Sequence, residues 1–60
     1  MDKKEAVVIA RQLKESNKFK YYASFIATSG SWEYPIQYDS YLEARELMLH
    51  RSKGKDFFIV

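Results

Sequence analysis

The sequence predicts a small α+β domain with the element order helix, strand, strand, helix, strand (αββαβ). Three observations predict it: alternating apolar residues on both sides of residues 28–31, apolar residues at helical spacing within residues 2–16, and a helix-capping sequence that starts at Ser40. A chain of 60 residues buries only about 60% of its unfolded surface in one thin core. Residues 1–60 are therefore expected to form a single domain.

The first helix is predicted at residues 2–16. Its main apolar residues share one face at about 100° per residue; they are Ala6, Ile9, Ala10 and Leu13. We expect Asp2 to cap the first turn and Asn17 to end the helix in the left-handed conformation. Val8 points away from the shared face and is surplus to the core of this helix.

Residues 19–38 are predicted to form a hairpin closed by a four-residue loop at residues 28–31. Phe19 begins the alternating apolar positions of the first arm. One register places every later apolar residue of that arm beside an apolar residue of the other; it pairs Tyr21 with Tyr38, Ala23 with Ile36, Phe25 with Tyr34 and Ala27 with Trp32. The same register places Lys20 opposite Asp39, which predicts a cross-strand ion pair.

Pro35 predicts the strand order. Proline has no N–H to donate, and the four-residue loop turns its nitrogen away from the first strand, so the second strand is expected at an edge of the sheet. The last strand then pairs with the first, which gives a three-stranded antiparallel sheet of order 2-1-3. We expect both helices to lie mainly on one face of this sheet and to leave the other face open.

The second helix is predicted from Ser40 to about Ser52. Ser40 and Glu43 have the spacing of a capping box, in which each side chain satisfies a free backbone N–H group. Gly54 has the position of a helix C-terminal glycine. Residues 56–60 are apolar after the first position and are predicted to form the last strand.

Apolar residues exceed what so small a core needs. The second helix has a core-facing stripe made of Tyr41, Ala44, Leu47 and Met48. Leu42 and Leu49 form a separate ridge about 100° or more from the middle of that stripe. These residues have two interpretations. Single exposed apolar residues are ordinary on the surface of a monomer. A small chain that has no disulfide or metal to stabilise it can instead use such residues to bind a partner.

The function expected from this surplus is that of a non-enzymatic protein-interaction module, such as a regulator or inhibitor. It would dock an apolar patch on a protein partner or on a second copy of the chain, and a homodimer is expected. The first predicted contact set is Leu42, Arg45 and Leu49. An alternative set on the open sheet face is Tyr22, Ile26 and Phe58.

The alternative function is nucleic-acid binding through the basic residues around Gly54, which are Arg51, Lys53 and Lys55. The net charge of +2 is too small to predict such binding by itself. No catalytic set is apparent, and no cofactor is expected. His50 and Glu46 lie one helical turn apart, but a third metal ligand is missing and the chain has no cysteine.

Charged residues rather than an apolar run follow Met1, so no signal peptide is expected. No stretch approaches the about 18 apolar residues of a membrane-spanning helix. We therefore expect a cytoplasmic protein that does not contact membranes.

Overall fold

The computed structural model describes residues 1–60 and has five elements. They are α1 (Lys3–Ser16), β1 (Tyr21–Phe25), β2 (Ile36–Tyr38), α2 (Tyr41–Ser52) and β3 (Phe57–Ile59). The strands form one antiparallel sheet in the order β2-β1-β3. The predicted α+β class, element order and sheet order are confirmed.

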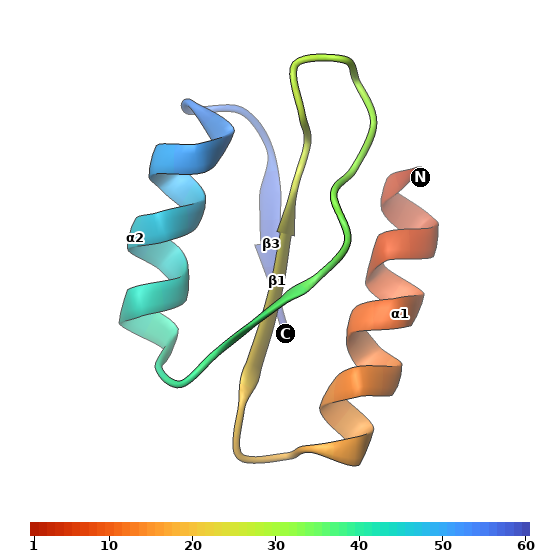
Figure 1. The fold of residues 1–60 in the computed structure, drawn as a ribbon, viewed down its shortest axis with the longest axis vertical. Helices are drawn as coiled ribbons and strands as arrows, with labels where there is room; N and C mark the ends of the chain where they lie inside the picture. The colour runs from red at the N-terminus through yellow and green to blue at the C-terminus, as the bar shows by residue number, and fades with distance from the viewer.

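The two helices pack on opposite faces of the sheet (Figure 1), so the expectation that both lie mainly on one face was wrong. Three consecutive residues of β1 are buried, namely Tyr22, Ala23 and Ser24. Because consecutive strand residues point to opposite faces, both faces of β1 are covered. The apolar residues that the sequence placed on an open face form the layer beneath α1.

Asp2 caps α1 as predicted, because its carboxylate accepts the Glu5 backbone N–H at 2.8 Å. At the other end, Asn17 has φ −141° and ψ 84°, so the predicted left-handed cap was wrong. Its N–H instead donates to the carbonyls of Leu13 and Lys14, both at 3.1 Å. These two bonds satisfy carbonyls of the last turn without a left-handed residue.

Ser40 begins α2 as predicted, with its hydroxyl accepting the Glu43 backbone N–H at 3.1 Å. The helix ends at Ser52 and is followed by two left-handed residues, Lys53 at φ 54° and Gly54 at φ 80°. Glycine adopts this conformation freely, whereas lysine is strained in it.

The hairpin follows the predicted register only near its open end. Tyr21 pairs with Tyr38 and Ala23 pairs with Ile36, as predicted. Farther along, Ile26 forms a bridge with Trp32, where Ala27 was expected to face the tryptophan. The second strand therefore holds one residue more than the first between the two pairings, which is the geometry of a β-bulge around Pro35.

The loop is the cause of the shift. The Gly30 N–H donates to the Ala27 carbonyl at 2.9 Å, and the Ala27 N–H donates to the Ser31 carbonyl at 2.8 Å. Gly30 has φ 88°, so the loop has three residues and ends in a left-handed glycine, a common hairpin closure. A one-residue change in the loop moves the following side chains to the other face of the sheet.

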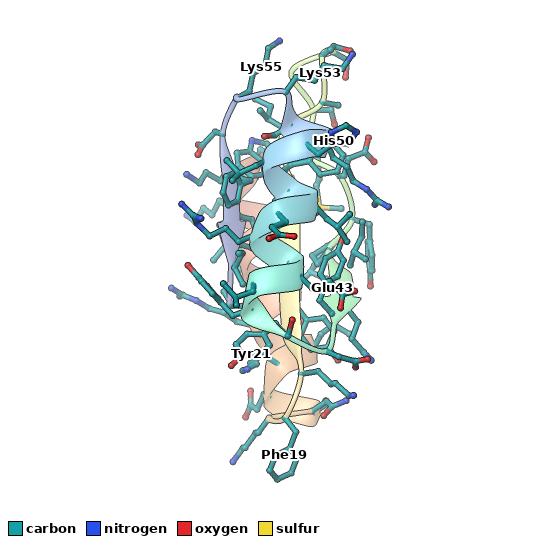
Figure 2. All side chains as sticks on the ribbon, turned by 90° about the vertical axis from the view of Figure 1, so that its left-hand side faces the viewer. Phe19, Tyr21, Glu43, His50, Lys53 and Lys55 are labelled. Atoms are coloured by element: carbon teal, nitrogen blue, oxygen red, sulfur yellow. The ribbon has the colours of Figure 1, made fainter.

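Trp32 and Phe25 consequently lie on opposite faces of the sheet, and the predicted Phe25–Tyr34 and Ala27–Trp32 pairs were wrong. Tyr34 is 58% exposed. Phe19 is also not part of the buried alternation: it precedes β1, is 90% exposed and points into solvent at one end of the molecule (Figure 2).

The core between the sheet and α2 is built on Ala23, Tyr38, Ala44 and Met48. Half-buried side chains pack around these four; they are Tyr21, Phe25, Ile36, Leu47, Phe57 and Ile59. The Tyr21 ring meets the Tyr41 ring edge-on, with 6.1 Å between the centroids. This layer holds most of the apolar residues that the period-2 pattern predicted to be buried.

The core between the sheet and α1 is aromatic. Trp32 stacks on Phe58 with 5.6 Å between the ring centroids, and the Lys3 ammonium lies 5.3 Å from the tryptophan ring. The buried residues of α1 are two alanines, Ala6 and Ala10. Their small side chains let the helix backbone approach the aromatic layer closely.

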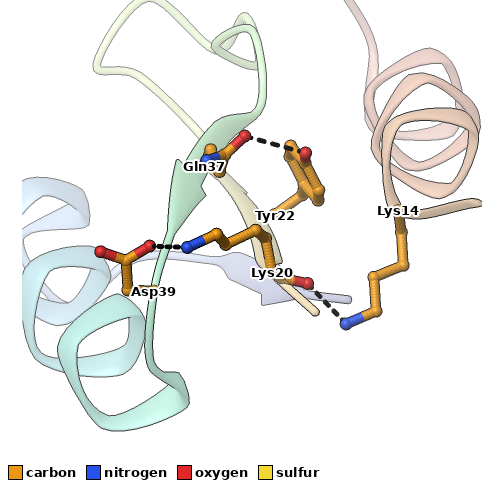
Figure 3. A network of polar contacts seen from close by, with 5 residues as sticks. All are labelled: Lys14, Lys20, Tyr22, Gln37 and Asp39. Carbon is orange, nitrogen blue, oxygen red and sulfur yellow. Dashed lines mark hydrogen bonds and ion pairs between the residues drawn. The ribbon is translucent and has the colours of Figure 1, made fainter. Parts of the chain in front are cut away.

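Three polar contacts hold β1 and the residue before it, Lys20, against neighbouring elements (Figure 3). The Lys20 ammonium lies 2.5 Å from the Asp39 carboxylate, which confirms the predicted ion pair. Lys14 donates to the Lys20 carbonyl at 2.6 Å, and the Tyr22 hydroxyl donates to Gln37 Oε1 at 3.0 Å. The strand is thereby tied to α1 and to β2.

Trp32→Ala is expected to unfold the protein. Removing a buried tryptophan side chain costs about 3–5 kcal/mol, which equals the about 3–5 kcal/mol that a domain of this size draws from its core. Tyr34→Ala is the matched control, because Tyr34 is exposed, and it should change the free energy of unfolding by less than about 1 kcal/mol. Urea denaturation followed by circular dichroism measures both. Equal losses for the two variants would contradict the observed register.

Candidate protein interface

The side of α2 that faces away from the sheet carries a ridge of exposed leucines. Leu42 is 69% exposed and Leu49 is 43% exposed, whereas Ala44 and Met48 on the same helix are fully buried. Leu42 and Leu49 are seven residues apart, so they lie on one side of the helix about two turns from each other. The predicted ridge is present and accessible.

The ridge faces outward from the sheet and leans toward the β3 side of α2. Glu43 and His50 lie on the flank toward β2 (Figure 2). Leu42 and Leu49 precede them by one residue, which is a rotation of about 100° about the helix axis. Since the buried side of α2 faces the sheet, this rotation places the leucines on the outward side of the helix, toward the β3 edge.

β3 is an edge strand with free backbone groups. The Tyr22 N–H donates to the Val60 carbonyl at 3.1 Å, and the Ile26 N–H donates to the Asp56 carbonyl at 3.1 Å. Because ladder bonds alternate along an antiparallel strand, Phe57 and Ile59 point their N–H and C=O groups away from β1. The outer edge of β3 thus offers two donors and two acceptors.

The other edge of the sheet is protected. Pro35 has no N–H group, and the bulge around it interrupts the line of β2. The Trp32 N–H donates to the Met1 carbonyl at 2.7 Å, so a backbone group beyond the bulge is also paired. Only the β3 edge combines free backbone groups with a neighbouring apolar ridge.

The alternative contact set is not on an open surface. Tyr22 is 5% exposed, Ile26 is half-buried, and Phe58 is half-buried against Trp32. All three lie on the sheet face that α1 covers, so the prediction of an open face there was wrong. The apolar residues on both sides of β1 were the one sequence signal that the helices cover different faces.

The basic residues around Gly54 gather at one end of the molecule. Arg51, Lys53 and Lys55 are exposed, and Lys53 and Lys55 lie together beyond the C-terminal end of α2 (Figure 2). None of the three forms an ion pair. The carboxylate next in the chain, Asp56, is bound to Lys3 at 2.9 Å.

The chain contains no group of three or more His, Asp or Glu side chains arranged to hold a metal ion. Neither helix has the length and apolar character needed to cross a membrane. Comparison with protein-family models, with curated proteins and with solved structures gives no significant match.

Lys53→Gly is expected to raise the free energy of unfolding by about 0.5–1 kcal/mol, because glycine removes the cost of a left-handed lysine. Lys55→Gly removes the same charge from ordinary backbone, and it should lower stability by about 0.5 kcal/mol through the entropy of the unfolded chain. Thermal and urea denaturation compare the two. A loss of stability in the Lys53 variant would be inconsistent with the left-handed cap.

Proposed function

We propose that this chain is a non-enzymatic protein-interaction module. Its contact surface, called here the α2–β3 surface, consists of Leu42, Arg45, Leu49 and the outer edge of β3. The observation that carries the proposal is the exposure of two leucines on the outward side of α2, the helix that packs over β3, whose outer edge has unpaired backbone groups. A partner strand and an apolar side chain can bind there at once, as in recognition by strand addition.

The energetics favour this surface over the rest of the molecule. Burying an exposed leucine contributes about 1.5–3 kcal/mol, and Leu42 has most of its side chain left to bury. Arg45 lies between the two leucines on the same helix and suits a polar rim around an apolar centre. Backbone bonds from Phe57 and Ile59 would fix the orientation of the partner.

A second candidate function, nucleic-acid binding, is favoured by the three exposed cations without ion pairs at the end of α2. Arg51, Lys53 and Lys55 would contact phosphates, and the affinity would fall steeply with salt. Labelled DNA and RNA at low ionic strength test this candidate in a mobility-shift assay. The absence of a shift excludes it, whereas a shift that disappears when the three residues are changed to glutamine supports it.

Leu42→Ser combined with Leu49→Ser is expected to leave the fold intact and to abolish association. Both side chains are exposed in the monomer, so the change in unfolding free energy should stay within about 1 kcal/mol. Circular dichroism checks the fold, sedimentation equilibrium measures self-association, and capture from host lysate measures binding to other proteins.

Val8→Ser is the matched control, because Val8 is 49% exposed on the outer side of α1. It should leave association unchanged. If the double leucine variant unfolds, the leucines belong to the core and the proposed interface is wrong. If it folds and associates as the unchanged chain does, the α2–β3 surface is not the contact surface.

A further inference from the structure

We draw no further inference here: the strongest candidate, the exposed leucine ridge on the outward side of α2 together with the free edge of β3, belongs to the surface already described, and nothing in the structure shows what covers it.

Discussion

The burial of β1 on both faces is the constraint on which the rest of the structure depends. Ala23 and Ser24 are fully buried although they point to opposite sides of the sheet. A strand with no exposed face has to lie between two layers, which puts the helices on opposite faces of the sheet. β1 also pairs with β2 on one side and with β3 on the other, so those two strands are the edges. The small side chains at these positions also let both helices approach the strand.

The two cores are built in different ways. Beneath α2, an alanine and a methionine of the helix meet a mixture of aromatic and aliphatic side chains. Beneath α1, the helix presents two alanines, and the sheet supplies the bulk through the stacked rings of Trp32 and Phe58. Each core is thin, so the chain relies on close packing in two places and not on one large apolar centre.

The sequence predicted the elements well because their signals are local. Helix caps at Asp2 and Ser40, the 3.6-residue spacing on both helices and the missing donor of Pro35 each determine one element or one edge. The side on which Trp32 packs depends on the loop length and on an extra residue near Pro35, which alternation of residues 19–38 does not reveal. Gly30 was the available signal, because a glycine in the left-handed conformation commonly closes a three-residue hairpin loop.

The exposed leucines of the candidate interface could be predicted because their signal is also local to one helix. Leu42 and Leu49 are surplus to the core stripe of their own helix, so a helical projection alone identifies them as exposed. Tyr22 and Ile26 are equally surplus to one face of the sheet, yet Tyr22 is buried and Ile26 is half-buried because the other helix covers that face. Whether such an apolar residue is exposed therefore depends on which face of the sheet each helix covers. A sequence with apolar residues on both sides of its central strand already indicates two covered faces.

The two sheet edges show how the remaining apolar surplus is distributed. At β2, proline has no N–H to donate and a bulge interrupts the strand, so only Gln37 points its backbone groups outward. At β3, the segment Phe57–Ile59 has no charge, proline or bulge, and its neighbouring helix flank carries the two exposed leucines. An exposed apolar edge favours aggregation unless something pairs with it. The two edges of the sheet therefore differ: β2 is interrupted by proline and a bulge, whereas β3 is a regular strand with outward-facing backbone groups.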